Sequence, residues 1–128
     1  MLDSSALVAI LRDEAERSDF IDAVIDDGNP RISSATYLEA SMVMELRFGD
    51  RGSRELDALL GEIGVEIVPF DEAQAKIARD AFRRYGKGLH RAALNLGDCF
   101  AYALAKALDA PLLFKGRDFA LTDVKRLL

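Results

Sequence analysis

Two neighbouring stretches of this chain decide its fold: LNLGDCFAYALAK, residues 94–106, and PLLFKGRDF, residues 111–119. The first predicts the start of a helix, because Asn95 is a good N-cap and the residues after it are rich in alanine and leucine. The second predicts a short buried strand that ends at a Lys-Gly pair. A helix packed on a parallel sheet begins at the edge where the strands end, and ligands bind at that edge. The pattern therefore brings Asp98 and Asp118 to one edge of a sheet.

Length and composition predict one domain, residues 1–128, since half of the residues are hydrophobic and supply a full core. The 17 Lys and Arg against 22 Asp and Glu give a net charge of −5, which argues against nucleic-acid binding over the whole surface but allows a local basic groove. A single cysteine excludes an internal disulfide and fits a reducing compartment. Without an apolar run of membrane-span length or a secretory signal, we expect a cytoplasmic protein that does not enter a membrane.

The rest of the chain alternates predicted strands and helices. Strands are expected at residues 1–2, 30–33 and 65–69. Helices are expected after a cap at Ser4 or Ser5, around residues 20–25 up to Gly28, over 36–48, from a cap at Ser53 to Gly64, and over 71–85. This alternation predicts an α/β fold with three layers, α/β/α, around a short and mostly parallel sheet.

The predicted helix over residues 36–48 has apolar residues on more than one face. Met42, Val43, Met44 and Leu46 exceed the single stripe that an amphipathic helix needs to join a core. A soluble monomer seldom exposes such a surface, so we expect a homodimer in which these residues contribute to the interface.

Four acidic residues fall at the same predicted edge of the sheet. Asp3 follows the first strand, Glu39 lies in the first turn of the helix after the second, Asp98 lies in the first turn of the helix before the last, and Asp118 follows that last strand. Clustered carboxylates repel one another unless cations lie among them. Mg²⁺ or Mn²⁺ would suit such oxygen ligands, and two ions about 4 Å apart would stabilise an in-line displacement at phosphorus.

Helix capping explains the same acids without a metal. Glu39 stands three residues after Thr36, and Asp98 three residues after Asn95, which is the spacing of a capping box. Acids near helix N-termini are favoured by the helix dipole as well. The residues alone leave both interpretations open.

The chain resembles the PIN-domain ribonucleases, specifically the VapC toxins of bacterial toxin–antitoxin pairs. The similarity covers essentially the whole chain and is carried by DSSALVA (3–9), YLE (37–39), LGDCFAYALA (96–105) and LLFKGRDF (112–119). The resemblance implies an α/β/α PIN-like fold, Mg²⁺- or Mn²⁺-dependent endonucleolytic cleavage of single-stranded or looped RNA, a homodimer, and a small antitoxin that blocks the site.

The resemblance also implies roles for particular residues. Asp3, Glu39, Asp98 and Asp118 match the acidic quartet of the family, as catalytic residues and metal ligands. Ser5 matches its small hydroxyl residue beside the first acid, and Asp123 a further acid that we assign a supporting role.

A basic segment precedes Asp98 and is our candidate for RNA contact. Arg84 lies on a face of the predicted helix, and Lys87 and Arg91 lie in or beside the glycine-flanked loop that leads directly to the acid. A solvated helix face is the plainer alternative to phosphate contact by these cations. We interpret Cys99 as a small buried filler, because no base stands near its thiol in the sequence.

Two other functions fit the length and the fold class. A phospho-acceptor receiver-like signalling domain would use Lys115 as its lysine after the last strand, but the acidic pair that it needs after the first strand is missing. A metal-free interaction domain would use the acids as helix caps only.

Overall fold

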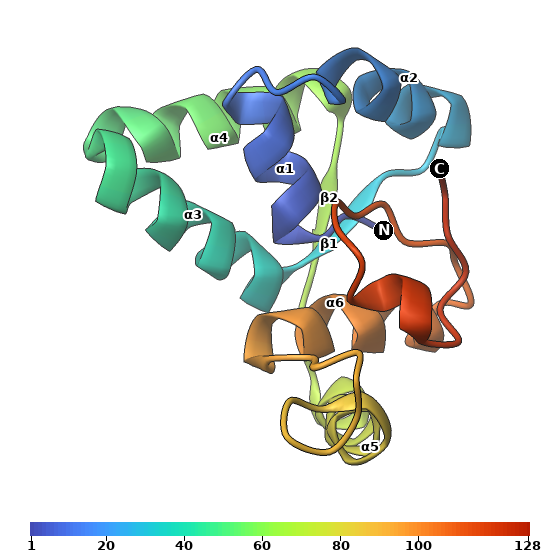
Figure 1. Ribbon diagram of the computed structural model, residues 1–128. Coiled ribbons are helices and arrows are strands. Elements are labelled where there is room, and N and C mark those ends of the chain that lie inside the picture. Colours follow the sequence, from blue (N-terminus) through green and yellow to red (C-terminus); the bar gives the residue numbers. More distant parts are fainter.

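The structure, a computed structural model, describes all 128 residues and places every predicted helix (Figure 1). The elements are α1 (Ser4–Leu11), α2 (Arg17–Asp27), β1 (Arg31–Ser33), α3 (Ser34–Phe48), α4 (Asp50–Ile63), β2 (Glu66–Val68), α5 (Glu72–Tyr85), α6 (Leu96–Ala107) and the 3-10 helix η1 (Phe119–Leu121). None of the helices has both the length and the apolar character required to cross a bilayer.

A short parallel sheet runs through the centre of the molecule. β1 pairs directly with β2. The N–H of Leu2 donates to the carbonyl of Arg31 at 3.0 Å, which joins residues 1–3 to β1. Isolated parallel bridges extend the sheet, from Leu2 to Leu113 and from Leu112 to Arg126. The predicted parallel sheet is confirmed, but its first strand is shorter than an ordinary strand because α1 begins at Ser4.

Helices cover both faces of this sheet. Met1, Leu112 and Phe114 belong to a buried cluster with α5 and α6, whereas Leu2 and Leu113 belong to a second cluster with α1, α2, α3 and α4. Alternate residues of an extended chain point to opposite faces, so neighbouring residues serve different layers. Figure 1 shows α5 and α6 on one side of the strands and α1, α2 and α4 on the other. The predicted three-layer α/β/α fold is thereby confirmed.

Two helices begin earlier than predicted because the preceding strand supplies the cap. Asp3, rather than Ser4 or Ser5, caps α1. Ser33, the last residue of β1, caps α3 by accepting the N–H of Ala35 at 3.2 Å. Glu39 therefore lies in the second turn of α3 and not in the first.

The start of α4 also differs from the prediction. Gly49 has a φ of 65° and is at once the C-cap of α3 and the N-cap of α4. Glycine adopts this left-handed region without steric cost, so the two helices follow without a loop. Ser53, the predicted cap, lies inside α4.

One flank of α3 is exposed and the other is covered by the same chain. The side chains of Leu38, Met42 and Leu46 are exposed. Met44, which we assigned to a dimer interface, is fully buried. α4 packs so closely there that a Cβ atom on Gly52 would lie 2.3 Å from the carbonyl oxygen of Met44. The second apolar face of α3 is thus covered by α4, and Met44 contributes to the core instead.

Candidate active site

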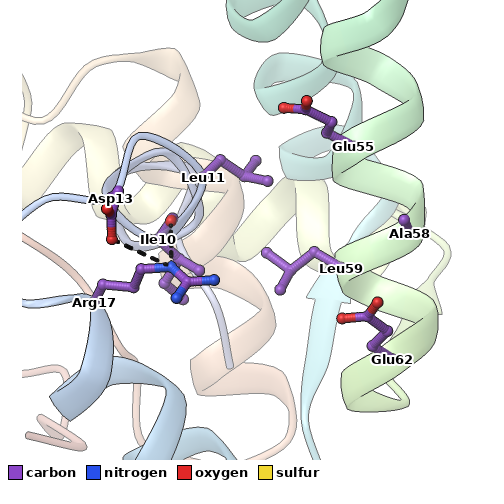
Figure 2. Close-up of a pocket in the computed structure, with 8 residues that line it drawn as sticks. All are labelled: Ile10, Leu11, Asp13, Arg17, Glu55, Ala58, Leu59 and Glu62. Atoms are coloured by element: carbon purple, nitrogen blue, oxygen red, sulfur yellow. Dashed lines mark hydrogen bonds and ion pairs between the residues drawn. The ribbon is translucent and has the colours of Figure 1, made fainter.

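The structure brings the four predicted acids together from four segments of the chain. Asp3 ends the first short strand, Glu39 lies on α3, Asp98 is the third residue of α6, and Asp118 precedes η1. Each is close enough for its charge to affect the protonation of a neighbour: the carboxyl of Asp3 senses Glu39 and Asp98, and that of Asp98 senses Glu39 and Asp118. A separate cleft between α1 and α4 contains none of these four acids (Figure 2).

Asp3 is the most deeply buried of the four. Its Oδ2 atom accepts the N–H of Ser5 at 3.0 Å and the hydroxyl of Ser5 at 2.5 Å. Its Oδ1 atom is buried and has no partner. Burial raises the pKa of Asp3 to about 7, against the hydrogen bonds from Ser5, and the charges of Asp98 and Glu39 raise it further. Ser5, which the resemblance matches to a small hydroxyl residue beside the first acid, is thus hydrogen-bonded to Asp3.

Glu39 reaches the site because residue 97 has no side chain. A Cβ atom on Gly97 would lie 1.7 Å from Oε2 of Glu39, so the carboxylate occupies the space that any other residue would fill. The φ of Gly97 is not positive, so close approach and not backbone conformation requires glycine here. Oε1 of Glu39 is buried without a partner. Gly97 belongs to the motif of residues 96–105, but the spacing of a motif does not reveal a contact with another helix.

Asp98 is part of a helix capping box and also lies among the other acids. It forms a capping box with Asn95: its Oδ2 accepts the N–H of Asn95 at 3.0 Å, and Oδ1 of Asn95 accepts its N–H at 2.9 Å. Burial raises the pKa of Asp98 to about 6, the bond from Asn95 opposes this, and the charges of Asp118 and Glu39 add to it. A helix cap therefore stands inside a cluster of like charges.

None of the four carboxylates forms an ion pair in the structure. The nearest lysine in the sequence, Lys115, contacts Glu14 and Glu16 instead. This placement also leaves Lys115 unsuited to the role that a receiver-like domain would give it. The negative charge of the cluster is uncompensated by the protein.

The four acids match the donor preference of Mg²⁺ or Mn²⁺, because all are hard oxygen ligands. The two orphaned oxygens, Oδ1 of Asp3 and Oε1 of Glu39, are costly to bury unless a partner binds them. The carboxylates are not drawn around one point, since no group of three or more Asp, Glu, His or Cys side chains has the geometry of a metal site. Repulsion between like charges favours this separation when no cation lies among them.

Asp123 lies outside the cluster and ties the C-terminal segment to α6 and α5. It accepts the hydroxyl of Tyr102 at 2.6 Å and the ammonium of Lys106 at 3.0 Å, and it lies 3.5 Å from Arg84. Partial burial opposes its ionisation, but the bonds from Tyr102 and Lys106 and the nearby positive charges prevail, and its pKa falls to about 2. These contacts hold the C-terminal segment against α6 and α5.

The three predicted RNA-binding cations differ in their surroundings. Arg84 is held by Asp80 and Asp123, and its guanidinium stacks 4.9 Å from the ring centre of Tyr85. Lys87 and Arg91 are exposed in the loop between α5 and α6 and form no ion pair. Asp123 lies far along the chain from Arg84, so the spacing within the basic segment does not reveal this ion pair.

Cys99 is buried, and burial raises the pKa of its thiol to about 11. The thiolate that a nucleophile requires is therefore disfavoured. This agrees with the interpretation of Cys99 as a filler of the core.

Comparisons with known proteins identify the family and the fold of the chain. The model of the PIN domain family matches residues 1–125. The chain is 56% identical to "Ribonuclease VapC" of Mycolicibacterium smegmatis, over 97% of this chain and 96% of that protein. It is 52% identical to "Ribonuclease VapC30" of Mycobacterium tuberculosis, over 97% and 95%. The fold is similar to the crystal structure of M. tuberculosis VapC20, described as a Sarcin-Ricin loop cleaving toxin, with a TM-score of 0.74, 13% identity, and coverage of 96% and 94%.

Proposed function

The chain belongs to the PIN domain family and, within it, to the VapC ribonucleases, and we propose that it hydrolyses phosphodiester bonds within RNA at the cluster of Asp3, Glu39, Asp98 and Asp118. One observation carries this proposal: four carboxylates from separate segments lie close enough to affect one another's protonation, and no cation of the protein pairs with any of them. With this activity the chain would be the toxin of a toxin–antitoxin pair. We propose that it acts as one domain in the cytoplasm, where its RNA substrate is found.

The proposed cofactor is Mg²⁺ or Mn²⁺, with the four acids as its ligands. When bound, the cation supplies positive charge that stabilises the charge developing on the phosphate. The residues around the acids prepare them for this role: Ser5 occupies Oδ2 of Asp3 and leaves Oδ1 free, and Gly97 makes room for Glu39. Because the pKa values of Asp3 and Asp98 are raised to about 7 and about 6, protons compete with the cation near neutral pH.

RNA contact through Lys87 and Arg91 is part of the proposal. Both are exposed and free of ion pairs, and their loop leads into the cap of α6 that carries Asp98. Arg84 contributes less to this contact, since Asp80 and Asp123 share its charge.

We further propose two protein partners. A cognate antitoxin would inhibit by placing an Arg or Lys among the four acids, where a guanidinium can pair with two carboxylates. A second copy of the chain would cover the apolar groove along α3 and α6, which is lined by Leu38, Met42, Leu46 and Leu96. Leu46→Glu should then convert a dimer to a monomer by light scattering, whereas a monomeric wild type at micromolar concentration would contradict the homodimer.

The experiment that tests the function is incubation of total RNA with the protein, with and without Mg²⁺ or Mn²⁺. Asp98→Asn removes one carboxylate charge and keeps the oxygen that caps the helix. Asp109→Asn is the matched control, because Asp109 is exposed and contacts only Lys125. We expect cation-dependent cleavage by the wild type and by Asp109→Asn, and none by Asp98→Asn. Cleavage by Asp98→Asn at the wild-type rate would refute the proposed site.

A further inference from the structure

Lys115 is a charged residue beside the candidate active site whose side chain points away from it. Its ammonium contacts Glu14 and lies 3.2 Å from Glu16, in the turn between α1 and α2. A lysine that neutralised the four acids, or bound a phosphate among them, would first have to leave both partners. The side chain of Lys115 is therefore engaged outside the site.

The backbone of Lys115, by contrast, reaches into the site. Residues 1–3 and 113–115 run in parallel: the N–H of Leu113 donates to the carbonyl of Met1 at 2.8 Å, and the N–H of Asp3 donates to the carbonyl of Leu113 at 3.0 Å. The next bond of such a ladder would join the N–H of Lys115 to the carbonyl of Asp3. That carbonyl already accepts the N–H of Ala6, at 3.2 Å, in the first turn of α1. The N–H of Lys115 needs another acceptor.

The hydroxyl of Ser5 is that acceptor. It accepts the N–H of Lys115 at 3.0 Å, so its own proton is directed to Oδ2 of Asp3 at 2.5 Å. The chain then turns at Gly116, whose φ is 104°, and reaches Asp118 two residues later. The position of Lys115 thus fixes Asp3 through Ser5 and sets the starting point of the turn that carries Asp118.

We propose that Lys115 is a positioning residue of the carboxylate site, held from outside by Glu14 and Glu16 and acting through its backbone N–H and the hydroxyl of Ser5 on Asp3. The inference rests on the proposed function, because it assigns Lys115 a role in the same reaction. It differs from a phosphate-binding role, in which the ammonium itself would contact the RNA.

Two variants that break the same ion pair from opposite sides distinguish these roles. The double variant Glu14→Gln, Glu16→Gln releases Lys115 but keeps its charge, whereas Lys115→Met removes the charge. A positioning role predicts that both variants lower kcat by about tenfold, leave KM for RNA unchanged, and weaken Mn²⁺ affinity measured by calorimetry. Lys115→Arg, which can still pair with both glutamates, should restore most of the loss. A phosphate-binding role predicts opposite effects, a lower KM in the double variant and a higher KM in Lys115→Met, and that pattern would overturn the proposal.

Lys125→Met is the matched control, since it breaks an exposed Lys–Asp pair of 3.0 Å elsewhere on the surface. It should leave kcat and Mn²⁺ affinity unchanged. Amide hydrogen exchange at residue 115 supplies a readout independent of catalysis, and we expect faster exchange in both variants and in Ser5→Ala. Wild-type kcat and Mn²⁺ affinity in both variants would overturn the inference. Failure of the wild type to cleave RNA in the same assay would overturn the proposed function instead.

Discussion

The contact between Gly97 and Glu39 gives the sharpest prediction of the structure. Gly97→Ala adds one carbon atom at a point 1.7 Å from Oε2 of Glu39, whereas a carbon and an oxygen in contact stay about 3.3 Å or more apart. The carboxylate must therefore withdraw by about 1.5 Å. A displacement of about 1 Å at a reacting centre can cost a factor on the order of 100, so we expect Gly97→Ala to slow RNA cleavage by about 100-fold.

Gly97→Ala should lose activity without losing stability. Alanine is favoured over glycine inside a helix by about 0.5–1 kcal/mol, and the three atoms nearest to the added carbon belong to the end of the flexible side chain of Glu39. Gly61→Ala in α4 is the matched control, because no atom lies within 4 Å of its added carbon. Both variants should melt at or above the temperature of the wild type, and Gly61→Ala alone should cleave RNA normally.

A double-mutant cycle isolates the contact between the two residues. The assays are single-turnover cleavage and Mn²⁺ calorimetry, with Gly97→Ala made in the wild type and in Glu39→Ala. If Gly97 acts through the carboxylate of Glu39, the substitution should have no further effect once that carboxylate is gone. Equal losses in both backgrounds, or no loss in either, would refute the reasoning.

Three further predictions concern charge. The fold raises the pKa of Asp3 from 3.8 to about 7 and that of Asp98 from 3.8 to about 6. Between about pH 4 and pH 7 the folded protein therefore binds protons that the unfolded chain has released. Without metal, the free energy of unfolding should fall as the pH rises through this range. Melting curves in a chelator should show this fall, Asp98→Asn should reduce it, and a melting temperature that rises through the window would contradict it. Asp123→Asn should lower the free energy of unfolding, measured in urea, by about 1 kcal/mol, a modest loss because solvent screens the charge of the partly exposed Asp123. It should leave Mn²⁺ affinity unchanged, and a tenfold loss of that affinity would make Asp123 a ligand. Lys87→Gln with Arg91→Gln should weaken RNA binding and lower the slope of log affinity against log salt by about 0.7 per lost phosphate contact, and an unchanged slope would assign the loop to ordinary solvated surface.

The features that the sequence predicted well are local ones. The capping box joins Asn95 and Asp98, which are only three positions apart, and both of its hydrogen bonds are present. The end of α2 at Gly28 follows from the left-handed backbone that glycine adopts, with a φ of 75°. The caps that were missed, Asp3 and Ser33, depend on where a short strand ends, and the sequence does not mark that point sharply.

The features that the sequence could not supply depend on contacts between distant residues. The bond between Lys115 and Glu14 joins positions 101 residues apart. Arg84 looked free to bind RNA in the sequence, but the fold brings Asp123 to it. Met44 looked exposed in the sequence, but α4, which follows in the chain, turns back and covers it. In each case periodicity and spacing describe one element, whereas the partner lies on another.

The most direct test of the account is calorimetric titration of Mn²⁺ into the wild type, Asp98→Asn and Asp109→Asn at the same pH. The four uncompensated carboxylates predict binding by the wild type and by Asp109→Asn with the same affinity, and an affinity reduced at least about tenfold in Asp98→Asn. Absence of binding by the wild type, or equal affinities in all three proteins, would contradict the assignment of this cluster as the active site.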